Sequence, residues 1–165
     1  MTVQDTARIP LRARDGSIRA YAIVDAADAA WANQWRWCLD SDGYAIRTEY
    51  AGPGQSVRLF RLHRELLGLR TGDGIEGDHI NRDRIDCRRA NLRIATRLQN
   101  AQNKSKRGET TSRHKGVYWF ARRGTWHARI SVQGKRIHLG FFSDEEEAGR
   151  VAQAARLRWY SYAVD

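Results

Sequence analysis

The chain has 165 residues, and its 29 Lys and Arg against 19 Asp and Glu give a formal net charge of +10. Hydrophobic residues make up 41% of it, enough for one ordinary folded domain or two small ones. This charge indicates a polyanionic partner, either nucleic acid or a membrane surface. Because no apolar run approaches the roughly 20 residues of a membrane span and residues 1–16 lack a signal-peptide core, we expect an intracellular protein that is not secreted.

The first 69 residues predict two hairpins, two short helices and one further strand. An Asp15-Gly16 turn between alternating apolar and polar residues predicts the first hairpin over residues 9–25. The alanine-rich segment 26–34 predicts a short helix. The remaining elements are a second hairpin around residues 41–43, a strand over 56–62 and a helical turn or two over 63–69.

The segment 76–100, EGDHINRDRIDCRRANLRIATRLQN, carries the candidate site. Residues 92–96 predict a strand and residues 97–103 the helix after it, so the order is strand, loop, strand, helix. This order brings Asp78-His79, at the end of the first strand, close to Asn100 on the helix. Six arginines accompany the centre and favour phosphate contact over a merely solvated face: Arg82, Arg84, Arg88, Arg89, Arg93 and Arg97.

These residue types suit the hydrolysis of a phosphodiester. Carboxylate and amide oxygens, as in Asp78 and Asn100, are hard ligands for Mg²⁺ or Mn²⁺. A neutral histidine beside them, His79, is able to take a proton from an attacking water. A single Asp-His pair is more often a turn or a surface hydrogen bond, but several such residues among arginines favour a site. His63 contacts phosphate or packs in the core, and we expect Cys87 to be inert.

Residues 62–69 and 77–103 resemble the HNH endonuclease family with its ββα-metal active site, through their spacings and through NLRIAT at 91–96. The likeness is to the phage and intron-encoded homing type, whose third signature residue is asparagine; residues 23–37 are also similar to the region before such motifs. The resemblance implies that His79 is the general base and that Asp78 and Asn100 hold one Mg²⁺ or Mn²⁺ per active site. It implies that Asn91 braces the loop and orients His79. The missing third histidine excludes zinc and favours nicking, and the family's products carry a 5′-phosphate and a 3′-hydroxyl.

The rest of the chain predicts a basic linker and a small sheet domain. Residues 101–114 are polar and lack periodicity, and three strands follow within 116–121, 125–132 and 135–142. A capping box at Ser143 and Glu146 opens a helix from 144 to about 160, with one buried face. The predicted buried face of the helix consists of Ala148, Val151, Ala155 and Trp159. Trp119 and Trp126 are expected in the same core as Trp159.

One side of this sheet is predicted to be basic. Residues 101–140 hold ten Lys and Arg and one acid, Glu109, and alternation places the basic side chains opposite the helix. Such a face is able to enter a major groove. The predicted contacts to DNA from the linker and the sheet are Lys104, Lys106, Arg107, Lys115, Tyr118, Arg122, Arg123, His127, Arg129, Arg136 and His138.

Residues 114–155, with the KGV start, the GxWxAxI strand and LGxF, resemble the Apetala2/ethylene-response-factor DNA-binding domain. In that family the open sheet face reads the major groove, and Lys115, Tyr118, Arg129, Arg136 and His138 fall at or near its contact positions. The first hairpin is one residue longer than the plant pattern, so Arg122 and Arg123 are not assigned individually. Several plant contacts are replaced, so the family's sequence preference does not carry over.

Together these observations predict an α+β protein with a nuclease domain over 1–103, a basic linker over 104–114 and a DNA-binding domain over 115–165. Its expected activity is that of a metal-dependent homing endonuclease acting on double-stranded DNA, as a monomer or weak dimer, in the cytoplasm of a bacterial or phage-infected cell. The alternative is a non-enzymatic DNA-binding regulator whose nuclease half has become a scaffold. An RNA-binding module is a third reading, disfavoured because stacking signatures on the sheet are weak.

Overall fold

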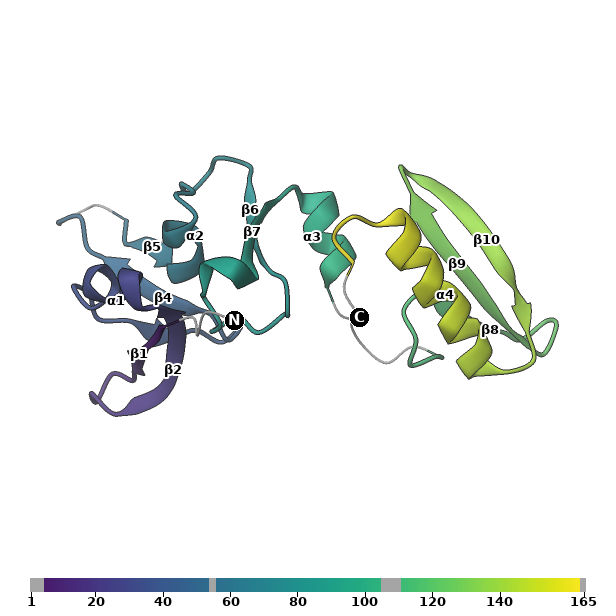
Figure 1. The fold of residues 1–165 in the computed structure, drawn as a ribbon, viewed down its shortest axis with the longest axis horizontal. Helices are drawn as coiled ribbons and strands as arrows, with labels where there is room; N and C mark the ends of the chain where they lie inside the picture. The colour runs from purple at the N-terminus through teal and green to yellow at the C-terminus, as the bar shows by residue number, and fades with distance from the viewer. Residues whose placement is uncertain (1–4, 54–55, 105–110, 164–165) are drawn as a thin grey trace. The chain divides into compact units, whose positions relative to one another are not determined.

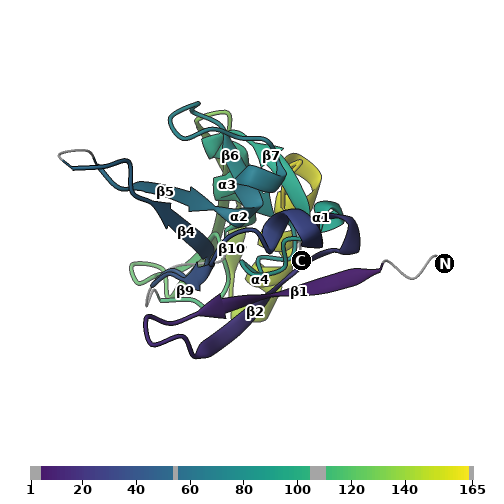
Figure 2. The same ribbon diagram turned by 90° about the vertical axis from the view of Figure 1, so that its left-hand side faces the viewer.

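The structure is a computed structural model that describes residues 5–53, 56–104 and 111–163. It divides into two compact units: unit 1, Met1–Asn100, and unit 2, Ala101–Asp165 (Figure 1). The strands and helices of unit 1 face the viewer in Figure 2. Both contain small antiparallel sheets and helices, which confirms a mixed α/β fold with few helices and several small sheets. No helix in the described ranges is both long enough and apolar enough to cross a membrane. The predicted boundaries at 103 and 115 stay predictions.

Unit 1 begins with the predicted hairpin. Strands β1 (Thr6–Arg12) and β2 (Ile18–Asp25) pair antiparallel, and the turn between them places Gly16 at a φ of 92°, a region that favours glycine. Leu11 and Val24 are fully buried in the core of unit 1. The alternation in the sequence therefore predicted the inner face correctly at Ala22 and Val24, whereas Ile18, on the same predicted face at the turn end of β2, is exposed.

The next elements follow in the predicted order. They are α1 (Ala26–Ala32), β3 (Cys38–Leu39), β4 (Ala45–Glu49), β5 (Arg58–Arg61) and α2 (Leu62–Leu66). Strands β3, β4 and β5 form an antiparallel sheet in that order. Trp37 is fully buried between the hairpin and α1, and its Nε1 donates to the Ala32 carbonyl at 2.8 Å. This core supports the elements that carry the candidate site.

The candidate site lies on a strand pair and the helix after it. These elements are β6 (Glu76–His79), the 3-10 turn η1 (Arg89–Asn91), β7 (Leu92–Ala95) and α3 (Arg97–Asn103). β6 pairs antiparallel with β7, and α3 follows β7 directly (Figure 1). The loop before η1 is fixed to β2, because Ile23 N donates to the Ile85 carbonyl and Cys87 N donates to the Ile23 carbonyl, each at 2.8 Å. The predicted order of strand, loop, strand and helix is present.

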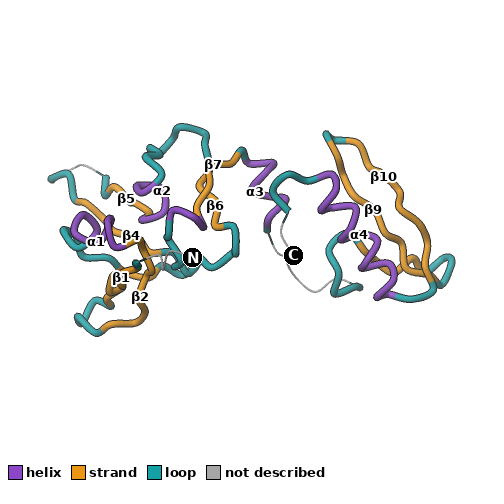
Figure 3. The backbone as a smooth tube through the Cα atoms, viewed as in Figure 1, coloured by secondary structure: helices purple, strands orange, loops and turns teal. Residues whose placement is uncertain are grey.

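Unit 2 contains a three-stranded sheet and one long helix. Strands β8 (Val117–Phe120), β9 (Thr125–Val132) and β10 (Lys135–Phe142) pair antiparallel in the order β10-β9-β8, and α4 (Glu145–Trp159) packs along the sheet (Figure 3). Small side chains let the helix approach closely, and the core residues are Val117, Ala128, Ala148 and Ala152. The three predicted strands and the predicted helix are all present.

Two predictions about α4 are wrong in detail. The N-cap is Asp144, whose carboxylate accepts from the backbone N–H groups of Glu146 and Glu147, and Ser143 is not the cap. Trp159 is 52% exposed, because the buried face of the helix ends on smaller residues about two turns earlier. Trp119 is also partly exposed, so two of the three tryptophans expected in this core lie at its edge.

Candidate functional site

The end of β6 places Asp78 and His79 on opposite faces of a short strand pair. Asp78 lies opposite Arg93 of β7, and His79 lies opposite Leu92. Successive side chains of a strand point to opposite sides, so the acid and the imidazole meet different neighbours. The two faces of the strand pair therefore have different chemical surroundings.

On the first face, Asp78 is held by its cross-strand neighbour. One carboxylate oxygen, Oδ2, accepts from Arg93 Nε at 2.8 Å and lies 2.7 Å from Arg93 Nη2. The Asp78 side chain is 7% exposed and that of Arg93 20%. A charge in such surroundings needs a partner, and the guanidinium supplies one.

The same face carries Glu76 and Asn100. Glu76 precedes Asp78 by two residues and therefore points to the same side of β6. The Asn100 side-chain nitrogen donates to the Glu76 carboxylate, which orients the amide and leaves its carbonyl oxygen for another partner. Arg97 Nε lies 3.8 Å from the same carboxylate. The sequence prediction named Asn100 but missed Glu76. The signal was present in the sequence, because alternation along a strand places Glu76 on the same side as Asp78.

On the second face, His79 is buried among other aromatic rings and a thiol. It is 4% exposed, its ring centroid lies 4.6 Å from that of His63 and 6.0 Å from that of Tyr44, and Cys87 Sγ is 3.8 Å from its Nε2. Burial lowers the pKa of His79 to about 4, although the carboxylates of Asp78, Asp83 and Asp86 act in the opposite direction. The imidazole is therefore neutral at pH 7, as a general base must be.

His63 packs beneath β6 and is a residue whose role the sequence left open. It is buried, and burial followed by the nearby His79 lowers its pKa to about 3. A Cβ added at Gly77 would lie 2.8 Å from His63 Cδ2, so glycine is what allows the ring to lie under the strand. Of the two earlier readings, the structure favours the packing histidine.

Cys87 is buried beside His79, and burial raises the pKa of its thiol to about 12. The thiol is therefore protonated at neutral pH, in keeping with the expectation that it is not a nucleophile. Its contact with His79 Nε2 nevertheless makes it part of the imidazole's surroundings.

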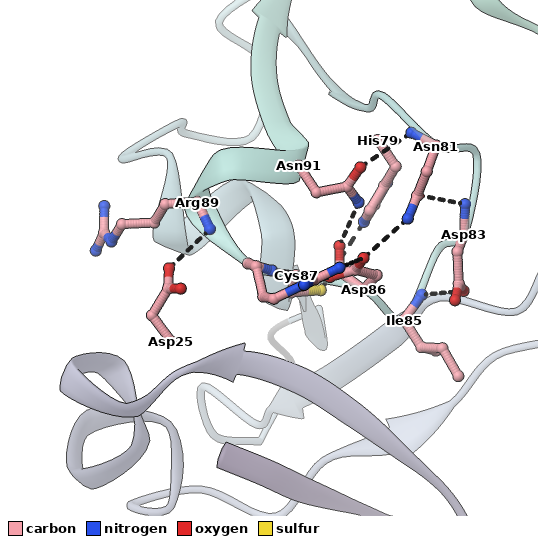
Figure 4. A network of polar contacts seen from close by, with 10 residues as sticks. Asp25, His79, Asn81, Asp83, Ile85, Asp86, Cys87, Arg89 and Asn91 are labelled. Atoms are coloured by element: carbon pink, nitrogen blue, oxygen red, sulfur yellow. Dashed lines mark hydrogen bonds and ion pairs between the residues drawn. The ribbon is translucent and has the colours of Figure 1, made fainter. Parts of the chain in front are cut away.

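Asn91 braces the loop that follows His79, as Figure 4 shows. Its side-chain oxygen accepts from Asn81 N at 2.9 Å, its side-chain nitrogen donates to the Asp86 carbonyl at 2.7 Å, and its own carbonyl accepts from Ile80 N at 2.8 Å. These three bonds tie both ends of the loop together. The structure thus gives Asn91 a bracing position next to His79; an effect on catalysis stays a prediction.

Several of the six arginines bind partners within unit 1. Arg88 pairs with Asp86 through Nε at 2.7 Å and Nη2 at 2.5 Å, and Arg89 pairs with Asp28 through two bonds of 2.8 Å. Arg84 lies over the Tyr44 ring at 4.8 Å and donates to the Asp42 carbonyl. Arg82 takes a left-handed conformation, with a φ of 67°. Phosphate contact by these arginines stays a prediction, because their present contacts are architectural.

The oxygen donors on the Asp78 face match the chemistry of a hard divalent cation. Glu76, Asp78 and Asn100 offer carboxylate and amide oxygens on one side of β6. The structure holds Asp78 on Arg93 and Asn100 on Glu76. Among the described residues, no group of three or more His, Cys, Asp or Glu is arranged to hold a metal ion. The donors fit the ion chemically, with Arg93 as a competitor for Asp78.

The outer face of the unit 2 sheet carries a row of polar and aromatic side chains across its strands. Tyr118 Oη contacts His127 Nδ1, and His127 Nε2 lies 2.6 Å from His138 Nδ1. Burial lowers the pKa of His127, as do the adjacent His138 and Arg129. Arg129 lies over the Tyr118 ring at 4.5 Å. The predicted outward side of the sheet is thus correct for these residues.

The other predicted contacts of unit 2 differ in their surroundings. Arg136 is exposed on β10, and Arg123 lies over the Phe141 ring at 4.5 Å beside exposed Arg122. Lys115 Nζ binds the carbonyls of Ala101, Gln102 and Lys104 at 3.1, 3.2 and 2.6 Å, which caps the end of α3. Lys115 therefore has a structural role that the sequence did not predict. Lys106 and Arg107 lie outside the described residues.

Residues 63–102 match a family model described as HNH endonuclease. The match begins at His63 and includes β6, β7 and nearly all of α3, which are the elements that carry the candidate site. No curated protein and no solved structure matches the chain. The HNH part of the resemblance is therefore supported, whereas the likeness of residues 115–165 to the Apetala2 domain stays a prediction.

Proposed function

We propose that the protein is a metal-dependent DNA endonuclease of the HNH homing type, which hydrolyses a phosphodiester at a site recognised by unit 2. The observation that carries the proposal is the match of residues 63–102 to the HNH endonuclease family. This range includes β6 with Asp78 and His79, η1 with Asn91 and the part of α3 that bears Asn100. The net charge of +10 is in keeping with DNA as substrate.

In this proposal His79 is the general base. Its neutral imidazole accepts a proton from the water whose oxygen attacks phosphorus, and Asn91 keeps the following loop in place. The bond from phosphorus to the 3′ oxygen breaks, and this oxygen takes a proton from solvent, which leaves a 3′-hydroxyl and a 5′-phosphate. Asp78 and Asn100 would hold one Mg²⁺ or Mn²⁺. When bound, such an ion stabilises the charge that develops on the phosphate and the leaving oxygen.

The role of unit 2 is to bind double-stranded DNA through the outer face of its sheet. Arg129, Arg136 and His138 lie on this face, opposite the side that packs on α4. Across 101–140 the chain holds ten Lys and Arg against one acid, whereas 141–165 holds five acids against three arginines. This asymmetry supports the sheet face as the one that meets phosphates.

The test is magnesium-dependent cleavage of a randomised DNA library by the full chain, with the ends mapped on both strands. A cut on one strand identifies a nicking enzyme, and staggered cuts on both identify a double-strand endonuclease that acts as a dimer. A protein that binds DNA but cleaves no member of the library with Mg²⁺ or Mn²⁺ would overturn the proposal.

The alternative is a DNA-binding regulator without nuclease activity, and two contacts favour it. Asp78 is held by Arg93, and His79 is buried among Tyr44, His63 and Cys87. Both contacts stabilise a folded scaffold whether or not hydrolysis occurs. The regulator reading predicts that the wild type cleaves no DNA with Mg²⁺ or Mn²⁺ and that His79→Ala lowers stability while DNA affinity stays nearly intact. The nuclease reading predicts that the wild type nicks DNA and that His79→Ala abolishes this cleavage as well.

A further inference from the structure

The contact between Asp78 and Arg93 places a cation on the carboxylate that is predicted to bind a metal ion. Arg93 Nε and Nη2 lie 2.8 and 2.7 Å from the same carboxylate oxygen, Asp78 Oδ2. The two side chains are largely buried, so the carboxylate charge is stable there only with a cationic partner. A guanidinium and a divalent ion that approach this carboxylate repel each other, and so the two compete.

The neighbouring carboxylate is balanced in a similar way. Glu76, on the same side of β6, lies 3.8 Å from Arg97 and accepts from Asn100. Arg97 is well exposed and lies near Glu76, whereas Arg93 is partly buried and pairs with Asp78 itself. Loss of the Arg93 contact would therefore change the electrostatics of Asp78 more than loss of Arg97 would. A phosphate group, with several acceptor oxygens, matches the planar donors of a guanidinium at least as well as a single carboxylate does.

We propose that Arg93 exchanges partners, from Asp78 in the free protein to a phosphate when DNA binds, and thereby couples the binding of DNA to the binding of the divalent cation. This inference rests on the proposed function, because it assumes that Asp78 is a cation ligand and DNA the substrate. Release of Asp78 by Arg93 makes the carboxylate available to the ion only when substrate is present. By linkage, the ion then raises the affinity for DNA by the same factor.

The first experiment measures the affinity of the full chain for Mn²⁺ without DNA by calorimetry. Arg93→Gln removes the competing cation and keeps a polar side chain, so Mn²⁺ is expected to bind about tenfold more tightly than to the wild type. Asp78→Asn in the Arg93→Gln background is expected to abolish that gain. Arg58→Gln is the matched control, because it removes an exposed arginine of β5 and is expected to leave the affinity unchanged.

The second experiment repeats the titration with a phosphorothioate duplex that is not cleaved. Wild-type protein is expected to bind Mn²⁺ about tenfold more tightly with the duplex than without it, and Arg93→Gln to show little change, since its carboxylate is already released. The Asp78→Asn variant with the same duplex measures the Mn²⁺ that DNA binds by itself. Arg93→Lys, whose ammonium makes a single contact, is expected to fall between the wild type and Arg93→Gln.

A folding defect in Arg93→Gln is itself informative. Without its partner the buried Asp78 destabilises the fold, and Mn²⁺ is expected to raise the melting temperature of Arg93→Gln more than that of the wild type. Unchanged or weaker Mn²⁺ affinity in folded Arg93→Gln, with no melting shift, would overturn the exchange of partners. A wild type that shows the coupling yet cleaves no DNA would refute the nuclease instead, so the two failures are distinct.

Discussion

Near the candidate site of unit 1, arginines bind carboxylates of their own chain, whereas arginines on the sheet of unit 2 lie over aromatic rings or are exposed. Arg88 and Arg93 are in ion pairs with Asp86 and Asp78. Arg129, by contrast, lies over Tyr118. Stacking on a ring leaves the edge donors of a guanidinium able to reach a phosphate, and a paired carboxylate occupies them.

A count of arginines around a motif therefore does not measure the positive charge that is available to DNA. In unit 1, acids close to the candidate site, such as Asp78 and Asp86, offset much of the positive charge of the arginines. These arginines hold the loop and the strand pair in place. In unit 2 the acids of the described residues gather on α4, where Glu145 accepts from Ser112 and Arg113, away from the outer sheet face. We therefore expect unit 1 to determine cleavage and unit 2 to determine affinity.

The largest expected effect separates cleavage from binding. His79→Gln removes the proposed base, and magnesium-dependent nicking of supercoiled plasmid should fall about 10²–10⁴-fold, the usual contribution of general base catalysis. DNA affinity, measured by fluorescence anisotropy in Ca²⁺, should stay within twofold, about 0.4 kcal/mol. His114→Gln is the matched control, since it removes an imidazole that pairs with Glu146 in unit 2. Undiminished nicking by His79→Gln would assign hydrolysis to another group.

Two glycines allow each unit to be perturbed separately. In unit 2, Gly116 has a φ of 88°, and a Cβ there would lie 2.7 Å from the Arg129 carbonyl oxygen, so Gly116→Ala should cost about 1–3 kcal/mol and weaken DNA binding. In unit 1, a Cβ at Gly77 would meet only side chains, those of His63 and Leu67, so Gly77→Ala should cost less stability and reduce the cleavage rate at saturating DNA. Thermal unfolding, anisotropy and plasmid nicking measure the three quantities.

If both glycine variants lower affinity and cleavage rate together, the division of labour between the units is wrong. We expect the larger loss of stability in Gly116→Ala because a backbone carbonyl shifts less easily than a side chain. A smaller loss in Gly116→Ala than in Gly77→Ala would contradict this explanation.

The buried His63 predicts acid sensitivity of unit 1. Its pKa falls from 6.5 to about 3 on folding, so below pH 6.5 the unfolded chain takes up a proton that the folded protein excludes. The contribution of His63 to the free energy of unfolding is therefore fully present above pH 6.5 and decreases by about 1.4 kcal/mol per pH unit toward pH 3. Hydrogen exchange of core amides such as Val24, from pH 7.5 down to 4.5, measures this loss.

His63→Phe fills a similar volume without a titrating group and should remove the part of that pH dependence that is due to His63. The part due to His79, whose pKa burial lowers to about 4, should remain. The comparison of variant and wild type at pH 7.5, where both side chains are neutral, isolates the packing difference. An unchanged slope in the variant would show that other groups cause the acid sensitivity.

The smallest expected effects concern DNA affinity and its salt dependence. Arg129→Gln and Arg136→Gln should each weaken binding a few-fold and reduce the slope of log affinity against log salt by about 1. Arg88→Gln should leave the slope nearly unchanged, because Asp86 already holds that guanidinium. An equal loss of slope in Arg88→Gln would show that ion pairing does not withhold arginines from DNA.

Local patterns carried most of the secondary structure. The Asp15-Gly16 turn and the alternation after it predicted the first hairpin, and the sequence around Asp78 predicted strand, loop, strand and helix. These features depend on backbone preference and short-range periodicity, which neighbouring residues determine.

The side-chain partners could not be predicted in the same way. Arg89 pairs with Asp28, 61 positions earlier, and the sequence offered no signal that would choose this acid over others. Trp159 was expected in the core because helical spacing predicts which side of a helix is buried but not where along the helix the burial ends. In the structure Trp159 is 52% exposed.

The sequence by itself determined the order of elements, the excess of positive charge and the residue types that suit phosphodiester hydrolysis. Only the tertiary structure decided that Arg93 lies on Asp78, that His63 lies beside His79 and that Lys115 caps α3. The physical reason is that turn and strand preferences act between neighbours in the chain. Ion pairs and buried ring contacts form between residues that meet only after the chain has folded, when burial makes an uncompensated charge costly.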